Sequence, residues 1–200
     1  SLWAVKVVTL FGGPENAAII HRIAAVIFLT AIVGHVVALF YKLLIRRQEG
    51  RFEWFGPDSL LPRWQDLKDM IGQFRWFFGK GQPPRFDRWT YWEKFDYWAV
   101  YWGAFVIGIS GLMLWFSEFL GRYLPGWVFN VATVAHGVEA FLSVTTLFVV
   151  HFFNNHFRPG KFPLDIVMFV GSWSVAELKE ERPEAYDRLV NTGTLEQHLV

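Results

Sequence analysis

The chain of 200 residues contains no cysteine. It therefore forms no disulfide, ligates no iron–sulfur cluster through thiolates and attaches no c-type haem through a C-x-x-C-H motif. Charge is scarce and nearly balanced, with 19 lysines and arginines against 18 aspartates and glutamates. The basic field of a nucleic-acid-binding protein is missing, and so is a glycine-rich nucleotide motif such as G-x-G-x-x-G. We expect flavin or nicotinamide chemistry to require another subunit.

Apolar residues are abundant: 53% of the chain is hydrophobic and 19% is aromatic. Three stretches, at residues 17–44, 97–116 and 127–153, are long and apolar enough to cross a bilayer as helices. The opening SLWAVKVVTLFGGPEN is neither a signal peptide nor a full span, so we expect upstream sequence. The composition predicts an all-α transmembrane bundle that forms one integral membrane domain over residues 1–200.

Basic residues predict the orientation of the three spans, because lysine and arginine near span ends are retained on the cytoplasmic side. The loop at 46–92 carries nine of them and the tail at 154–200 carries five, whereas the opposite side shows little beyond Lys6 and Arg122. We expect the loop and tail to be cytoplasmic. The first and third spans then run in the same direction, from outside to inside.

Four histidines in the apolar segments are the principal functional signal, because polar side chains are costly in lipid. His21 and His35 are fourteen residues apart and His136 and His151 fifteen, which corresponds to about 21 Å and 22 Å of helix. Parallel spans would pair His21 with His136 near the outer face and His35 with His151 near the inner face. Because a bis-imidazole iron takes one nitrogen from each side, the pattern predicts two non-covalent haem b groups.

The histidines also allow other interpretations. Each one alone could simply bond a neighbouring helix. A proton relay or transition-metal site needs ligands a few ångströms apart, and only Glu139 supplies a carboxylate within a span. His156 follows His151 by about 140° around an α-helix and is expected to face the interface or a quinone head group. Arg22 is either a haem-propionate partner or a snorkelling cation.

Further patterns predict the surroundings of the spans. The stretch SLLPRWQDLKDMIGQFRWFF at 59–78 has helical amphipathic spacing and predicts a helix in the inner interface, with a helix packed on a partner subunit as the alternative. Ser174 and Glu177 indicate a capping box that opens a short charged helix. A stripe of small residues at 104, 108 and 111 permits either close helix approach or room for a haem edge. Tryptophans at 89, 92, 98, 115 and 127 predict aromatic belts.

The blocks HRIAAVIF, WEKFDYW and HFFNNHFRP, together with the histidines, resemble the cytochrome b/b6-domain proteins related to the gamma subunit of membrane-bound formate dehydrogenase. The resemblance covers nearly the whole chain and implies a di-haem cytochrome of a prokaryotic cytoplasmic membrane. It implies His21 and His136 as outer ligands and His151 as one inner ligand. That family has four spans, and a histidine of the first completes the inner haem. This chain begins where the second should, so we expect His35 to take that place; a ligand from an absent or separately encoded helix is the alternative.

The resemblance implies a respiratory electron-transfer subunit of an oxidoreductase complex. It would pass electrons between menaquinone or ubiquinone and a redox partner, such as a multihaem cytochrome or an iron–sulfur protein. Candidate quinone-contacting residues on the inner side are Glu93, Lys94, Asp96, Asn154, Asn155, His156 and Arg158. The alternatives are a non-redox membrane anchor and a ferric-reductase-like enzyme, which would need an appended flavin and nicotinamide domain.

Overall fold

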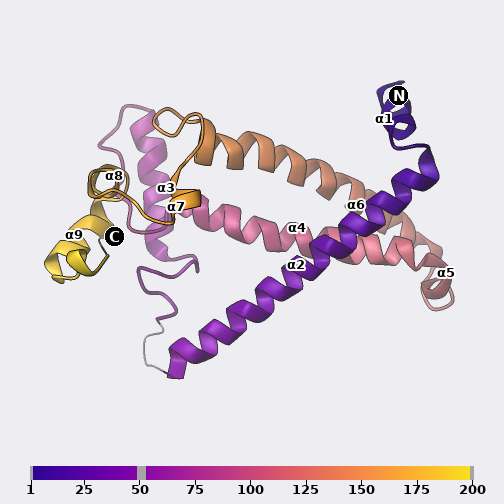
Figure 1. Cartoon of the computed structure of the whole chain (residues 1–200), viewed down its shortest axis with the longest axis horizontal. Coiled ribbons are helices and arrows are strands. Elements are labelled where there is room, and N and C mark those ends of the chain that lie inside the picture. Colours follow the sequence, from indigo (N-terminus) through magenta and orange to yellow (C-terminus); the bar gives the residue numbers. More distant parts are fainter. Residues whose placement is uncertain (1, 49–52, 199–200) are drawn as a thin grey trace. The chain divides into compact units, whose positions relative to one another are not determined.

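A computed structural model describes residues 2–48 and 53–198, with side chains for 2–45 and 53–196. Throughout these residues the regular structure is helical and no strand occurs (Figure 1), which confirms the all-α prediction for this part. The side chains of Arg46, Arg47 and Arg51, which contribute to the predicted charge asymmetry, lie outside the described residues. The chain forms two compact units, Ser1–Phe52 with Tyr101–Ala140 and Glu53–Val100 with Phe141–Val200.

Three helices of the described part are long and apolar enough to cross a membrane. They are α2 (Pro14–Gln48), α4 (Tyr91–Trp115) and α6 (Gly126–Thr145), the last continued by the π-helical segments η1 (Thr146–His151) and η2 (Phe153–Phe157). Each contains most of a predicted span, but α4 begins earlier than expected. The reason is a capping box in which Glu93 accepts from the Thr90 amide at 2.9 Å and the Thr90 hydroxyl accepts from the Glu93 amide at 3.3 Å.

The spans leave most of their apolar surface uncovered by the chain itself. The most apolar stretch of α2 has no buried residue. Among the described residues, the buried hydrophobic side chains are only Ala104, Ala132 and Ala185. Exposed apolar area on this scale is unfavourable in water and is normal against lipid tails. These three helices therefore indicate a membrane protein.

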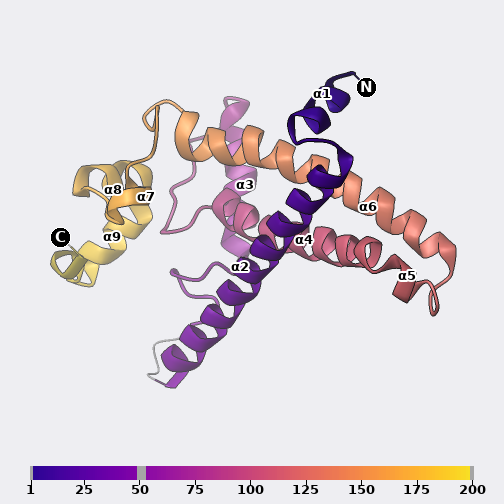
Figure 2. The ribbon, with the colours of Figure 1, turned by 45° about the vertical axis from the view of Figure 1, so that its right-hand side comes forward.

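The first unit contains α1 (Leu2–Leu10), α2, the second part of α4, α5 (Ser117–Leu120) and the first part of α6. Gly12 and Gly13 have positive φ in the bend between α1 and α2, which both views show (Figure 2). A Cβ on Gly108 would lie 3.0 Å from the Leu29 side chain, and one on Gly111 would lie 3.0 Å from the His136 ring. The small-residue stripe thus admits close approach by α2 and α6, the first of its two predicted uses.

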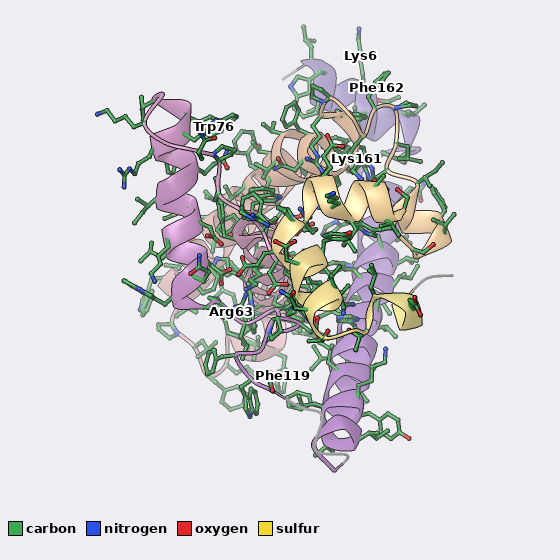
Figure 3. The ribbon with its side chains drawn as sticks, turned by 90° about the vertical axis from the view of Figure 1, so that its left-hand side faces the viewer. Lys6, Arg63, Trp76, Phe119, Lys161 and Phe162 are labelled. Atoms are coloured by element: carbon green, nitrogen blue, oxygen red, sulfur yellow. The ribbon has the colours of Figure 1, made fainter. Side chains whose placement is uncertain are left out.

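The second unit contains the amphipathic helix α3 (Trp64–Phe77), which begins after Arg63 (Figure 3). The Arg63 amide donates to Asp66 at 2.5 Å and caps the helix, while Gly79, with φ of 68°, follows its end. Leu60 and Leu61, which the amphipathic pattern included, precede the helix. Exposed apolar side chains at helical spacing line one side of α3 and its C-cap and form the α3 apolar face: Trp64, Leu67, Ile71, Phe74 and Phe78. Trp76 and Phe77 are also exposed but lie off this face.

Ion pairs link the extramembrane helices of this unit to the beginning of α4. Lys94 is 2% exposed and its Nζ lies 2.9 Å from both carboxylate oxygens of Asp66 on α3. Arg182 is 4% exposed and donates to Glu93 at 2.7 Å. Because a buried charge without a partner is costly, these pairs fix where α3 and the tail dock.

The tail forms α7 (Val167–Val170), α8 (Val175–Glu181), α9 (Pro183–Asn191) and the 3-10 turn η3 (Leu195–His198). Ser174 caps α8 by accepting from the Glu177 amide at 3.1 Å, which confirms the predicted helix start. The single charged helix expected there is wrong, because Pro183 starts a second helix that packs on the first (Figure 2). The Glu177 carboxylate pairs with Lys161, which lies close to this helix pair (Figure 3).

Candidate functional site

His21 of α2 and His136 of α6 face each other in the first unit. Their ring centroids are 6.0 Å apart and their planes are perpendicular. Imidazole nitrogens bind metals at about 2 Å, so two imidazoles on opposite sides of one iron have ring centroids about 6 Å apart. The structure therefore brings together the two residues predicted as outer ligands, at a separation that suits bis-imidazole ligation.

Helix α4 supplies the hydrogen-bond partners of His136. Its Nδ1 lies 3.2 Å from the Ile107 carbonyl oxygen and 3.1 Å from the Ser110 hydroxyl. A carbonyl oxygen only accepts, so Nδ1 is the donor, and the neutral tautomer that makes this bond has its lone pair on Nε2. The Gly111 backbone lies under the ring, where a Cβ would contact it. This is the arrangement in which a histidine has one nitrogen oriented by the protein and the other available to a metal.

Two further polar groups lie near this pair on the same helices. Glu139, three residues after His136 on α6, is 9% exposed and engaged with other groups. Arg22, directly after His21, places its guanidinium 5.3 Å from the centre of the Trp115 ring. That contact holds a cation against an aromatic ring at the end of α4, and the propionate and snorkelling interpretations of Arg22 both remain predictions.

His35 lies on α2 next to Tyr101 of α4. Their ring centroids are 6.1 Å apart and their planes are tilted by 34°. Both residues belong to the first unit, whereas His151 belongs to the second. The pairing of His35 with His151 is therefore still a prediction from sequence, as is the alternative of a ligand from another helix.

His151 ends η1 and contacts the carboxylate of Asp96, which comes from α4 in the same unit. Its Nδ1 donates to the Asp96 Oδ2, because a carboxylate accepts. The Asn155 amide nitrogen lies 3.1 Å from the same Nδ1 and 3.4 Å from Nε2. A carboxylate on the second nitrogen is one of the usual ways in which proteins orient a ligating histidine.

His156 lies close to His151, and its predicted placement about 140° around the helix is wrong. The two ring centroids are 6.5 Å apart. The reason is that η2 is a π-helix, in which hydrogen bonds run between residues five apart. His156 Nδ1 accepts from the Asp165 amide at 3.4 Å. His151, Asn155, His156 and Asp96 thus form one polar group, which we call the His151 cluster.

Three of the other candidate quinone contacts form ion pairs, and their contact with a quinone stays a prediction. Lys94 and Glu93 are held by Asp66 and Arg182, and Arg158 donates to Glu181 at 2.6 Å. These charges anchor the extramembrane helices. Asn154 is half-buried on η2. Of the predicted inner-side residues, the structure gathers Asp96, Asn155 and His156 around His151.

Sequence reasoning missed the roles of Ser110 and Asp96 as partners of the histidines. The sequence pattern indicates Asp96 only as a possible quinone contact and gives Ser110 no role. A serine within an apolar helix is a weak signal, because its hydroxyl can bond its own backbone, as Ser110 does to Val106 at 2.5 Å. The register between α4 and α6 is needed to pair either residue with its histidine.

Within the described residues no group of three or more histidine, cysteine, aspartate or glutamate side chains is arranged to hold a metal ion. A six-coordinate haem iron takes only two ligands from the protein, because its porphyrin supplies the other four. Comparison of the chain with protein-family models, with curated proteins and with solved structures found no significant match.

Proposed function

We propose that this protein is a membrane-bound b-type cytochrome subunit that carries electrons between a quinone pool and a redox partner. The observation that supports it most is the pair His21 and His136, which comes from two span-length helices with a ring separation of 6.0 Å. His136 of this pair is oriented by the Ile107 carbonyl oxygen, a neutral group that cannot take up its proton. A histidine held in this way is better suited to binding a metal than to passing on a proton.

The residues present fit a non-covalent haem. The chain has no cysteine for thioether attachment, so binding would depend on imidazoles and on packing. When bound, haem supplies reversible one-electron exchange at iron. The protein would contribute two imidazoles, apolar helices that exclude water, and Arg22 as a cation for a propionate.

We propose that His151 holds a second haem, with His35 as its partner. The spacing of fourteen and fifteen residues within the two segments supports two haem levels. A histidine of another helix is the alternative to His35. The contact between the Nδ1 of His151 and Asp96 supports this proposal, because a ligating histidine commonly has its second nitrogen bonded to a carboxylate, a carbonyl or water.

The His151 cluster is the proposed quinone-reactive region. Quinone chemistry requires a hydrogen-bond donor and a proton acceptor beside the electron carrier. Asn155 supplies an amide donor. His156 accepts from the Asp165 amide at Nδ1, so its own N–H is at Nε2 and is a second donor, and the Asp96 carboxylate is the group that can accept a proton. With the loop and tail on the cytoplasmic side, this cluster would face the inner leaflet of a prokaryotic cytoplasmic membrane.

The experiment is to measure the haem content of two single variants of the full chain in detergent. His136→Ala should lose one haem and retain the other, and His151→Ala should lose the opposite one, so each retains about half of the wild-type haem. The remaining absorption bands identify which haem is lost. Equal loss of both haems from either variant would contradict two separate sites, and His35→Ala with full haem content would place the fourth ligand elsewhere.

The non-redox anchor makes the opposite prediction, because a pure anchor is colourless. A ferric-reductase-like enzyme would also bind haem. It is distinguished by a flavin and nicotinamide domain, fused or encoded alongside.

A further inference from the structure

The groups that accept from Nδ1 differ in charge between His136 and His151. His136 directs Nδ1 to a backbone carbonyl oxygen at 3.2 Å and to the Ser110 hydroxyl at 3.1 Å, and both partners are neutral. His151 directs Nδ1 to the Asp96 carboxylate. Each contact is made within its own unit and each comes from α4.

The carboxylate of Asp96 has no competing cation in its neighbourhood on α4. Lys94, two residues earlier, has both of its short contacts to Asp66. The other members of the cluster, Asn155 and His156, bring an amide and an imidazole rather than a fixed cation. The side chain of Asp96 is 20% exposed, so solvent screens its charge only in part.

We infer that Asp96 is a positioning residue that gives the His151 site a lower midpoint potential than the His136 site. The inference rests on the proposed function. A carboxylate that accepts from Nδ1 makes the imidazole a stronger electron donor, and its negative charge favours the ferric over the ferrous state. A carbonyl and a hydroxyl stabilise the ferric state much less, because they are neutral.

The consequence concerns the direction in which electrons move most readily. Transfer of one electron from the His151 site to the His136 site would oxidise ferrous haem iron at the His151 site to ferric and reduce ferric haem iron at the His136 site to ferrous. With the inferred order this step is favourable. The chain therefore favours electron flow from the quinone-reactive cluster toward the His136 level.

The test is a potentiometric titration of the purified, haem-loaded full chain, followed optically. The wild type should titrate as two components, which His136→Ala and His151→Ala assign because each variant retains one. The component that survives in His136→Ala should have the lower potential. The opposite order would overturn the inference.

Asp96→Asn provides the sharper test, because the amide keeps a carbonyl acceptor for Nδ1 and removes the charge. We expect the oxidised-to-reduced ratio of the His151 component to change at least tenfold at a fixed potential, a rise of about 59 mV for a one-electron couple. The other component should stay unchanged. Asp96→Glu should stay near the wild-type value.

Two controls separate the specific contact from general effects. Asp187→Asn removes an exposed carboxylate that pairs with Arg85 in the same unit, and it should shift neither component. Ser110→Ala should affect only the His136 component. If Asp96→Asn loses haem from the His151 site while Asp96→Glu keeps it at the wild-type potential, the positioning role is supported.

The outcomes also separate this inference from the function on which it depends. A wild-type chain that binds no haem overturns both. A chain that binds two haems, but whose components do not move or move equally in Asp96→Asn, overturns the inference and leaves the proposed function standing.

Discussion

At the scale of single residues, Lys94 and Asp66 are the most consequential pair outside the histidine sites. Lys94 is 2% exposed and has both of its short contacts to the Asp66 carboxylate. Lys94→Met should lower stability by about 3–5 kcal/mol, because it leaves Asp66 buried without its cation. Thermal unfolding in detergent, followed by circular dichroism, measures the loss.

The double variant Lys94→Met with Asp66→Leu is the control for that prediction. It removes both charges, and it should recover most of the lost stability because no buried charge remains unpaired. A double variant as unstable as the single one would contradict this reason, because the loss of stability would then not come from an unpaired buried charge.

The pKa of Glu184 is raised above its ordinary value of 4.5 by desolvation at its docking site and by the nearby carboxylates of Asp87 and Asp69. A raised carboxyl pKa means that the folded state binds more protons than the unfolded state. Glu184 therefore favours folding at low pH, and this contribution is lost as the pH rises from 4.5 through the folded pKa. Glu184→Gln should raise the melting temperature slightly at pH 7 and flatten its pH dependence above 4.5.

The control for Glu184 is its neighbour in α9, Asp187, whose partner is Arg85. Asp187→Asn should not stabilise the protein at pH 7, because it removes an opposite charge from Arg85. Melting curves of both variants from pH 4 to pH 8 make the comparison. A Glu184→Gln chain less stable than wild type at pH 7 would contradict the assigned sign.

At the scale of elements, the close approach of α4 and α6 at Gly111 positions His136. A Cβ at Gly111 would lie 3.0 Å from the ring, whereas one at Gly137 would meet nothing within 4 Å. Gly111→Leu should therefore displace the imidazole and reduce haem at the His136 site severalfold, since a misplaced ligand binds poorly. Gly137→Leu, directly after His136 on α6, should retain the haem content of the wild type.

Helix α3 shows how much of an element can be read from its sequence. Its apolar spacing predicted an amphipathic helix, and Trp64, Ile71 and Phe74 are indeed exposed on one side. That pattern does not reveal that Asp66 would be buried, because its cation lies 28 residues away on α4. Local periodicity predicts which side of the helix is apolar, whereas the burial of Asp66 depends on how α3 and α4 pack.

The orientation of α3 can be measured because the chain has no native cysteine. A single Phe74→Cys variant, labelled with an environment-sensitive dye and placed in lipid nanodiscs, should report an apolar surrounding. The dye emission should be clearly blue-shifted relative to the free dye in water. Gln65→Cys, at an exposed position about 180° around the helix from Phe74, should report water. If both positions report water, α3 is not inserted in the interface and docks elsewhere.

The π-helical segments were not predictable from the same rules. The spacing of the apolar residues in 127–153 fits a uniform α-helix, and the sequence contains no proline there that would signal an interruption. The structure nevertheless widens the helix over η1 and η2, which brings His156 to His151. Such segments occur preferentially at functional sites, because they reposition a side chain without breaking the helix.

At the scale of the whole molecule, the three apolar helices and the sparse buried core are consequences of composition. A chain that is 53% hydrophobic and leaves large apolar side chains exposed along α2, α4 and α6 requires an apolar surrounding. Length, hydropathy and histidine spacing therefore predicted the helices and the residues of the His21 and His136 pair. They did not predict which neutral or charged partners orient the imidazoles, because those partners come from another helix.

The central claim is that the chain holds two haems between histidines. The most direct test is the haem-to-protein ratio of the purified full chain, from its pyridine haemochrome spectrum and amino-acid analysis. The account predicts two haem b per chain, with the sharp reduced bands of low-spin, bis-histidine iron. A colourless chain, isolated intact after expression with ample haem, would contradict it.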